Sequence, residues 1–336
     1  MKLNSSNTCP HCGNSQLKVV KNYDTVHNGI RPLYQCTHCE KIFSQTYGTP
    51  MATLKTPLSK IASVLRVRSE GLGQRATGRV FEVHKNTVAD WEERFAEQKA
   101  PLMLYAFCHE FISLRFEGDE LYTITGQRVD ACDSQGWTAV VMERASRFIV
   151  AQQCGQKDAQ MFEEVMQVVA SYLEQSDDVT FLSDGERRYG NTLFDLCAEV
   201  VRTGQPGRPP KALPEGVKVR LKNKGNQSSK PGRKRPKYQA PHREHPNTAP
   251  TLESSDIHAN HLEAYNAALR RRNSAFRRRT NTYAKSKTAL QRILDVHQLI
   301  HNFVRIHWTT GQVPAVALGI LMAPLSLEEI LTQRFA

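Results

Sequence analysis

Two pairs of cysteines near the N-terminus place the tightest constraint on how this chain folds. Each pair has the spacing Cys-x-x-Cys, in CPHC and CTHC, and 23 residues separate the pairs. One such pair folds two thiolates onto a metal ion, so two pairs supply the four ligands of a tetrahedral Zn²⁺ site. Four protein ligands favour a structural metal over a catalytic one. The sequence therefore predicts a zinc ribbon in residues 1–50, with ligands Cys9, Cys12, Cys36 and Cys39.

The segment between the two pairs predicts a β-hairpin. Runs of β-branched and aromatic residues lie on both sides of His27-Asn28-Gly29, a sequence typical of a tight turn. The metal replaces a core that so short a segment cannot build. The other cysteines stand singly in apolar surroundings, and we expect them to be buried, reduced thiols: Cys108, Cys132, Cys154 and Cys197.

Residues 51–106 have a helical period and predict a helix-turn-helix DNA-binding domain. A turn is expected at 82–84, and the apolar positions of the three helices are Leu58, Ile61 and Leu65, then Leu72, Ala76 and Val80, then Val88 and Trp91. The third helix opens with Lys85, Asn86 and Thr87, which we expect to contact phosphates and base edges. A three-helix module that does not bind DNA is the alternative, because such patterns are permissive.

The pattern changes to α/β in residues 107–201. Strands are expected at 116–126, 136–142 and 147–153, followed by an amphipathic helix at 159–173 and a buried strand at 179–182. Three successive strands, a helix and a further strand predict a mixed sheet flanked by helices.

Residues 202–250 concentrate the positive charge of the chain. They contain thirteen Lys or Arg, two acidic residues and nine of the sixteen prolines, a local charge of +11 within a net charge of +12. We expect a basic, proline-rich insertion, whose few apolar residues form at most a short hairpin. Such a segment favours nucleic-acid contact. The residues expected to bind DNA are Arg208, Arg233, Lys234, Arg235 and Lys237.

Residues 251–336 return to helix. A helix is expected from Asp256 to about residue 279, with Glu263, Asn266, Arg270 and Arg277 on one face. A second amphipathic helix is expected within 290–308, and an apolar segment at 313–320 closes the domain.

Three carboxylates occur in an order that suggests a metal site. Asp119 lies in the first strand of the α/β region, Asp184 directly follows the strand VTFLS, and Glu263 lies on the later helix. Together they fit a site that holds two Mg²⁺ ions. Asp130 and Asp133 are competitors for the role of Asp119, although their sequence DACDSQG is typical of a turn.

These residues resemble the DDE transposases of bacterial insertion sequences, in the ribonuclease H-like superfamily that includes retroviral integrases. The resemblance rests on FEGDELYTITG, FLSDGERRYGNTLF, HANHLEAYNAALRRRNSAFRRRTNTYAKS and HNFVRIHWTTGQVPAVALGI, together with the cysteine pairs, and is greatest to the InsA/InsB type. It implies a multidomain α+β protein. A ribonuclease H-like α/β catalytic core in two parts, 107–201 and 251–336, would be interrupted by the insertion at 202–250.

The resemblance also implies a function. Asp119, Asp184 and Glu263 would be the catalytic, magnesium-binding triad, with Mg²⁺ or Mn²⁺ as cofactor. Of the 79 residues from the second to the third carboxylate, removing the 49-residue insertion leaves 30, close to the spacing common in related sites. Phosphate contacts are expected from Arg270, Arg271, Arg272, Arg277 and Lys285.

The expected reaction is cleavage of DNA ends and strand transfer. The partners would be double-stranded DNA, as transposon ends and target, and further copies of the chain in a homodimer or higher oligomer on DNA. The sequence has no apolar run of about 18 residues, so we expect no membrane partner. We expect a cytoplasmic, nucleoid-associated protein of a prokaryote. Two alternatives remain: a non-catalytic zinc-ribbon and helix-turn-helix regulator, and a structure-specific ribonuclease H-like nuclease.

Overall fold

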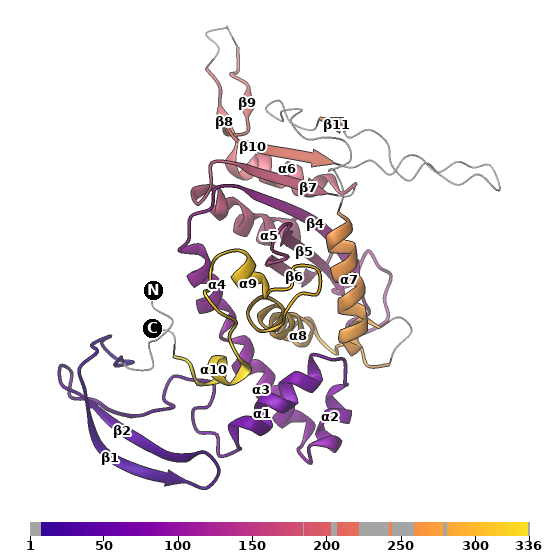
Figure 1. Cartoon of the computed structure of the whole chain (residues 1–336). Coiled ribbons are helices and arrows are strands. Elements are labelled where there is room, and N and C mark those ends of the chain that lie inside the picture. The colour runs from indigo at the N-terminus through magenta and orange to yellow at the C-terminus, as the bar shows by residue number, and fades with distance from the viewer. Residues whose placement is uncertain are drawn as a thin grey trace.

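A mixed β-sheet lies at the centre of the molecule (Figure 1). The structure is a computed structural model and describes residues 8–183, 185–202, 207–221, 242–243, 259–277 and 281–334. The sheet has six strands in the order β11-β10-β7-β4-β5-β6. Their bounds are β4 Leu114–Tyr122, β5 Trp137–Glu143, β6 Ile149–Gly155, β7 Val179–Ser183, β10 Val217–Leu221 and β11 His242–Arg243. The predicted mixed sheet is confirmed.

The first strand of the sheet domain, β4, lies in the middle of the sheet. The three successive strands β4, β5 and β6 pair antiparallel, as their order along the chain predicts. The chain then crosses through α5 (Ala159–Ser171) to β7, which pairs parallel with β4 on its other side. A second crossover, through α6 (Arg187–Cys197), leads to β10, which is parallel to β7. The parallel arrangement brings the ends of β4 and β7 to the same edge of the sheet.

Helices bury the sheet on both of its faces. On β5, Val141 belongs to the apolar cluster that includes α5, whereas the adjacent Val140 packs with α7 (Asn260–Arg272) and α8 (Lys287–Leu299). All but the first residue of β5 are buried. A run of apolar residues without polar alternation is typical of a strand covered on both faces.

The three predicted helices of residues 51–106 are confirmed, with one error in the buried face, and a fourth helix was not predicted. The helices are α1 Leu58–Arg68, α2 Gln74–Val80, α3 Lys85–Ala96 and α4 Lys99–Phe107. On α2, Val80 is 65% exposed, and Thr77 and Gly78 are buried instead. The predicted buried face of α2 was wrong because the helix spans only seven residues and packs against α3 through small side chains.

The turn between α2 and α3 depends on this close approach. A Cβ atom at Gly78 would lie 2.7 Å from the carbonyl oxygen of Val83, whose amide donates to the Gly78 carbonyl oxygen at 2.9 Å. Glu82, within the turn, has a φ of +52°. A larger residue at position 78 would therefore push the turn away from α2.

The helices α1 to α4 share one hydrophobic core with the sheet. Trp91 and Phe95 of α3 belong to the same cluster as Phe116 of β4, and α3 packs against α8. Two ion pairs support this arrangement. Arg68 pairs with Glu92 at 2.7 Å within the helical module, and Lys99 pairs with Asp295 of α8 at 2.6 Å.

The N-terminal strands form a separate three-stranded antiparallel sheet. Its strands are β1 Leu17–Thr25, β2 Gly29–Cys36 and β3 Ile42–Ser44. The predicted hairpin is confirmed, with Gly29 at a φ of +69°. Arg334, from the C-terminal end of the chain, is only 3% exposed and donates hydrogen bonds to the carbonyl oxygens of Thr8, Gln45 and Tyr47. The two ends of the chain are thus joined through this small sheet.

The structure of residues 202–250 differs from the prediction. We expected at most a short hairpin, but β10 is a full strand of the central sheet. β10 covers the edge that β7 would otherwise leave unpaired. Its Val217 and Val219 are 5% and 1% exposed, because they pack in the main apolar cluster. A short pair, β8 (Glu199–Val200) and β9 (Lys211–Ala212), precedes it. Residues 217–221 of the predicted insertion therefore belong to the central sheet, and residues 203–206, 222–241 and 244–250 lie outside the described residues.

The predicted long helix of residues 256–279 is shorter in the structure. The helix α7 ends at Arg272, and Asn273 leaves the helical path and caps a 3₁₀ turn, Ser274–Phe276. Arg277 consequently does not share a helix face with Glu263. Residues 251–258 and 278–280 lie outside the described residues.

The second predicted helix is confirmed as α8. It continues into a π-helical turn, Ile300–Val304, and is followed by α9 (Pro314–Ala317) and α10 (Leu327–Thr332). None of the described helices combines the length and apolar composition that a membrane crossing needs.

The single cysteines only partly match expectation. All are free thiols, and Cys154 is buried, but Cys108 and Cys132 are exposed. Both exposed residues lie beyond the elements that form the core: Cys108 directly follows α4, and Cys132 lies in the turn before β5.

We predict that Gly78→Ala destabilises the α2–α3 unit by about 1–3 kcal/mol, because the added methyl group overlaps the Val83 carbonyl group. Thermal unfolding of the full chain measures the effect. Arg75→Ala, at an exposed position of the same helix, is the control and should change stability by less than about 0.5 kcal/mol. Equal stability of Gly78→Ala and the unsubstituted protein would contradict the prediction.

Candidate functional site

The predicted first carboxylate, Asp119, lies at the edge of the sheet where β7 ends. Ser183, the last residue of β7, pairs with Gly118, and Asp119 is the next residue of β4. Asp119 is half-buried and pairs with Val140 of β5 on its other side. It therefore lies between two strands, at a position that helices on both faces can reach.

One face of the sheet holds the backbone of Asp119. The hydroxyl group of Tyr189, on α6, donates to the Asp119 carbonyl oxygen at 2.9 Å. Burial, followed by the negative charges of Glu120 and Asp119, raises the pKa of Tyr189 well above its ordinary value, so the phenol stays protonated and donates. The ring has room because residue 118 is glycine: a Cβ atom there would lie 2.6 Å from the ring of Phe181 and 3.4 Å from that of Tyr189.

The opposite face brings α7 to the Asp119 side chain. The amide nitrogen Nδ2 of Asn266 donates to Asp119 Oδ2 at 2.9 Å, and Asn266 is 3% exposed. Glu263 lies three residues earlier on α7, on the same side of the helix, and is exposed. The structure thus brings together Asp119 and the helix face that carries Glu263.

The polar atoms beside Asp119 fit a hard divalent cation. Asn266 Oδ1 is buried and accepts no hydrogen bond from the residues that the structure describes. A buried oxygen without a partner is costly unless a cation or water satisfies it. Carboxylate and amide oxygens are the ligands that Mg²⁺ and Mn²⁺ prefer. Asp119, Asn266 and Glu263 therefore offer oxygen ligands suited to such a cation.

A buried carboxylate, Glu117, fastens the start of α7 to β4. Glu117 is fully buried, and as the second residue before Asp119 it points to the same face of the sheet. Its Oε2 accepts from the backbone N–H of Leu262 at 3.1 Å, and its Oε1 lies 2.6 Å from His261 Nδ1 and 3.3 Å from Arg144 Nε.

This contact replaces a missing helix cap. The N-cap residue of α7 is Ala259, whose side chain makes no capping hydrogen bond, so Glu117 satisfies an amide that the helix leaves open. A negative charge is also favoured at a helix N-terminus. Because Glu263 lies in the first turn of α7, Glu117 sets its position relative to Asp119.

Neither Glu117 nor His261 was predicted from the sequence to belong to the site. A signal was present for Glu117, since strand alternation places it on the face of Asp119 in FEGDE. No comparable signal identifies its partner, because the two residues are 144 positions apart.

The predicted second carboxylate, Asp184, lies outside the described residues. Its neighbours are described: Ser183 ends β7, and Glu186 caps α6 by accepting from the Arg188 amide at 3.2 Å. Burial alone would raise the pKa of Glu186, but hydrogen bonds and charge from Arg188, with the charge of Lys157, lower it to about 2. Glu186 is therefore an ionised residue already engaged by two cations.

The two competing aspartates form a turn, as their sequence predicts. The Asp133 amide donates to the Asp130 carbonyl oxygen at 3.0 Å, and both residues are exposed in the loop between β4 and β5.

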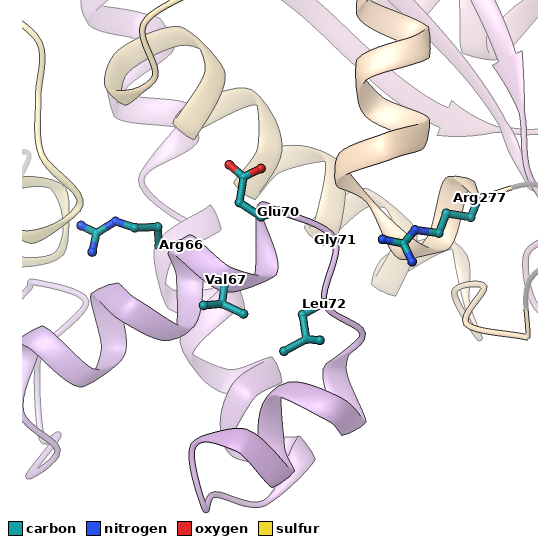
Figure 2. Close-up of a pocket in the computed structure, with 6 residues that line it drawn as sticks. All are labelled: Arg66, Val67, Glu70, Gly71, Leu72 and Arg277. Carbon is teal, nitrogen blue, oxygen red and sulfur yellow. The ribbon is translucent and has the colours of Figure 1, made fainter.

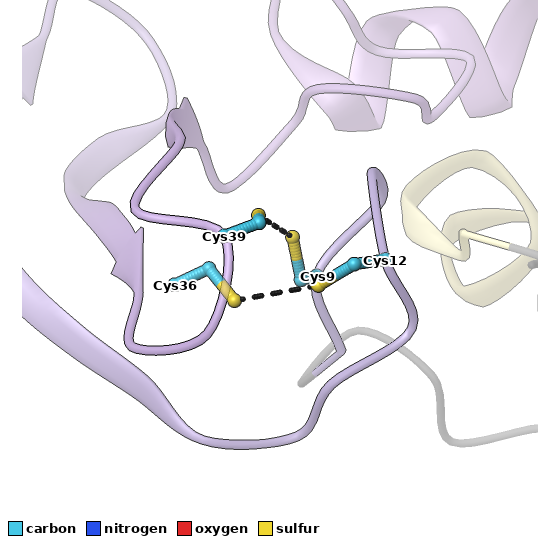
Figure 3. A group of neighbouring side chains, drawn as sticks. All are labelled: Cys9, Cys12, Cys36 and Cys39. Carbon is cyan, nitrogen blue, oxygen red and sulfur yellow. Dashed lines mark hydrogen bonds between the residues drawn. The ribbon is translucent and has the colours of Figure 1, made fainter.

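The four N-terminal cysteines form a compact sulfur cluster (Figure 3). Their Sγ atoms all lie within 4.8 Å of one another, with Cys9 and Cys39 3.6 Å apart and Cys12 and Cys36 3.5 Å apart. Sulfur atoms bound tetrahedrally to Zn²⁺ at about 2.3 Å are separated by about 3.8 Å. The cluster therefore fits one Zn²⁺ ion, and within the described residues no other group of three or more acidic, His or Cys side chains is this close.

Backbone amides approach two of the sulfur atoms. The N–H groups of His11 and His38 lie 3.5 Å and 3.4 Å from the sulfur atoms of Cys9 and Cys36. At Cys36, hydrogen bonds from the Cys39 and His38 amides outweigh burial and lower the pKa to about 6. Thiolates are the form that binds metal.

The residues predicted to contact DNA are spread over several elements. Lys85 and Asn86 are exposed at the start of α3, and Thr87 is half-buried; the helix is capped by His84, which accepts from the Asn86 amide. Arg208 and Lys285 are exposed, and Arg270, Arg271 and Arg272 form the last turn of α7. The remaining predicted residues of the basic segment lie outside the described residues: Arg233, Lys234, Arg235 and Lys237.

Arg277 lies against the connection between α1 and α2. Both line a cavity of about 320 Å³, and Figure 2 shows Arg277 extending toward Gly71 and Leu72, with Arg66 and Glu70 on the other side. A Cβ atom at Gly71, whose φ is +96°, would lie 2.8 Å from the Arg277 guanidinium and 3.0 Å from the Arg271 carbonyl oxygen. The helix-turn-helix segment thus touches the chain immediately after α7.

Comparison with known proteins gives only weak similarities. No protein-family model matches the sequence, and no curated protein is similar to it. A solved structure of the Mos1 mariner paired-end complex with Mn has 13% identity, with 41% of this chain and 56% of that chain covered and a TM-score of 0.17. A pre-cleavage Mos1 transpososome has 11% identity, coverage of 82% and 78%, and a TM-score of 0.25. This chain thus spans just over half the length of the first, and TM-scores this low do not define its fold.

We predict that the purified chain holds one Zn²⁺ and that Cys36→Ser loses it, because three thiolates cannot replace the closed four-ligand site. Metal analysis by mass spectrometry measures the zinc content, and circular dichroism follows the folding of the N-terminal sheet. Cys132→Ser, at an exposed single cysteine, is the control and should retain the metal. Full zinc content in Cys36→Ser would contradict the prediction.

We predict that Glu117→Ala destabilises the protein by about 3–5 kcal/mol, because it leaves Arg144 and His261 without their buried carboxylate. Glu117→Gln keeps an oxygen that can accept from the Leu262 amide and should cost less, about 1–2 kcal/mol. Chemical denaturation measures both. The exposed Glu110→Ala is the control, and equal effects of the Ala and Gln variants would exclude the capping role.

Proposed function

We propose that the chain is a DDE-type transposase that binds the terminal inverted repeats of an insertion sequence and catalyses Mg²⁺-dependent end cleavage and strand transfer. The observation that carries the proposal is the hydrogen bond from Asn266 to Asp119. It holds the face of α7 that carries Glu263 against the central strand, one residue beyond the Gly118–Ser183 pair. Asp184 follows Ser183 directly in the sequence.

The arrangement of the sheet supports a ribonuclease H-like catalytic core. Its first strand is central, has an antiparallel neighbour on one side and a parallel neighbour on the other, and is covered by helices on both faces. The parallel neighbour matters because a carboxylate within β4 and one that follows β7 meet at the same edge. The proposed core consists of 107–201 and 251–336 together with β10.

The proposed roles of the residues follow from their positions. Asp119, Asp184 and Glu263 would together hold the Mg²⁺ or Mn²⁺ ions. Such ions supply an activated nucleophile and neutralise charge on the phosphate. Asn266 orients the Asp119 carboxylate through its amide N–H. Glu117 holds the first turn of α7, and therefore Glu263, in place.

The other parts of the chain are proposed to bind DNA. The start of α3 would enter the major groove of the terminal repeat, and the basic residues of 207–250 and of the end of α7 would bind phosphates. The zinc ribbon in 1–50 and the helices of 51–106 would form the end-binding part of the protein. We propose that a homodimer or higher oligomer joins two DNA ends, in the cytoplasm of a prokaryote.

The test is cleavage of DNA that carries the sequences flanking the coding region. With Mg²⁺, the purified protein should nick this DNA at the element ends, and Asp119→Asn, Asp184→Asn and Glu263→Gln should each reduce the rate about 1,000-fold or more while end binding is retained. Gel analysis of labelled DNA measures cleavage, and a mobility shift measures binding.

Controls in the same assay separate the alternatives. Asp130→Asn and Glu163→Gln, at exposed positions, should cleave at the unsubstituted rate. Loss of cleavage in Asp130→Asn with full activity of Asp119→Asn would move the first ligand to the turn. End binding without cleavage at any Mg²⁺ or Mn²⁺ concentration would indicate a regulator. Cleavage governed by DNA shape rather than by the terminal sequence would indicate a nuclease.

A further inference from the structure

A cationic cavity lies beside α7, on the side that faces residues 297–309. The cavity has a volume of about 420 Å³ and lies between α7 and the chain that follows the π-helical turn. Its floor is made of aromatic and imidazole rings, with Tyr265 5.1 Å from His301 and His301 6.0 Å from His307 between ring centroids. Its lining includes three charged residues, Arg271, Arg272 and Arg305, and the exposed Trp308.

Positive charge in this cavity exceeds the negative charge that the described residues bring to it. Arg305 is held by Glu70 and by Ser69 Oγ, which accepts at 3.0 Å, and Arg272 lies 3.7 Å from the same Glu70 carboxylate. The Glu70 carboxylate is thus shared by the guanidinium groups of Arg272 and Arg305. Arg271 adds a third positive charge to the cavity lining.

One polar group of the cavity, the guanidinium of Arg305, has an unsatisfied hydrogen-bond donor within the described part of the chain. Arg305 Nη1 is buried and donates no hydrogen bond to the residues that the structure describes. Burial, followed by the nearby charge of Arg272, lowers the pKa of Arg305, so the guanidinium is held in unfavourable surroundings. Burial also lowers the pKa of His301 to about 3, which leaves its ring neutral. An anion such as phosphate would satisfy Arg305 Nη1 and offset the guanidinium charges.

Trp308 lies at the mouth of this cavity and is 98% exposed. Its backbone belongs to a defined turn, in which the His307 amide donates to the Gln312 carbonyl oxygen at 2.8 Å and the Gly311 amide donates to that of His307 at 2.9 Å. Its ring is therefore presented by an ordered turn. A flat aromatic ring beside cationic groups is the pattern that stacks on unpaired bases, because bases in a duplex already stack on their neighbours.

We propose that the cavity binds a phosphate of single-stranded DNA and that Trp308 stacks on the adjacent unpaired base. This inference rests on the proposed function, because it assumes that the partner is DNA. It adds that an unpaired nucleotide binds to the helix that carries Glu263. Both sites share α7, which carries Glu263 and Asn266 on one face and the cavity-lining Arg271 and Arg272 in its last turn.

Tryptophan fluorescence tests the stacking without any need for cleavage. The chain has three Trp residues; Trp91 is 1% exposed and Trp137 is half-buried, so Trp308 is the one that solvent and DNA reach freely. The full-length protein, without added divalent cation, is titrated with a thymidine 12-mer and with a blunt 12-base-pair duplex. We expect the single strand to quench the emission of Trp308 and the duplex to quench it much less.

Variants separate stacking from charge. Because the Trp308 variants lack the fluorophore, affinity is measured by the anisotropy of a dye-labelled thymidine 12-mer. Trp308→Ala should weaken single-strand binding about 10-fold, and Trp308→Phe should restore most of it, because one base–aromatic stack is worth about 1–3 kcal/mol. Arg271→Gln should reduce the slope of log K against log salt by about 0.7, the value for one lost phosphate contact on a single strand. Ile112→Ala, an equally exposed apolar residue away from the cavity, is the matched control and should bind normally.

The outcomes distinguish this inference from the proposed function. Unchanged single-strand affinity in Trp308→Ala, or equal quenching by the duplex, would overturn it. Quenching by the single strand in a protein that cleaves no end DNA would support the inference and contradict the proposed function. Asp119→Asn, which the proposed function makes inactive, should bind the single strand as tightly as the unsubstituted protein.

Discussion

The central strand β4 is buried by helices on both of its faces, and this burial determines how the polar groups of the site are held. A buried polar group needs a partner, and Glu117 and Asp119 on β4 find partners on the covering helices. Glu117 contacts the first turn of α7, the Asp119 side chain contacts Asn266, and the Asp119 backbone accepts from Tyr189 on the other face. The site is thus built by the requirement to satisfy these groups, which leaves Asp119 little freedom to move.

The helix α7 links three parts of the molecule. Its first turn is fastened to the sheet by Glu117, its middle presents Asn266 to Asp119, and its last turn carries the arginines that line the cationic cavity. Glu70, at the end of α1, pairs with both Arg272 and Arg305. These charged contacts join α7 and the C-terminal segment to the N-terminal helices.

Local patterns predicted most elements because their physical causes are local. Cysteine spacing, helical period and strand hydrophobicity identified the sulfur cluster, α1, α3, α5 and the strands β4 to β7. The errors have tertiary causes. The face of α2 is decided by the close approach at Gly78, and β10 forms because β7 offers an edge to pair with. The end of α7 at Arg272 depends on Asn273, whose side chain caps the following turn instead.

The sequence by itself determined which residue types were available: four thiolates at metal-binding spacing, carboxylates in a strand and on a helix, and a cationic C-terminal half. Only the tertiary structure decided which of them meet. Asn266 and Asp119 are 147 residues apart, and His261 and Glu117 are 144 apart, so no local period relates them. They come together because apolar residues of β4, β5, α7 and α8 share one cluster, and that packing fixes the register in which helix and strand face each other.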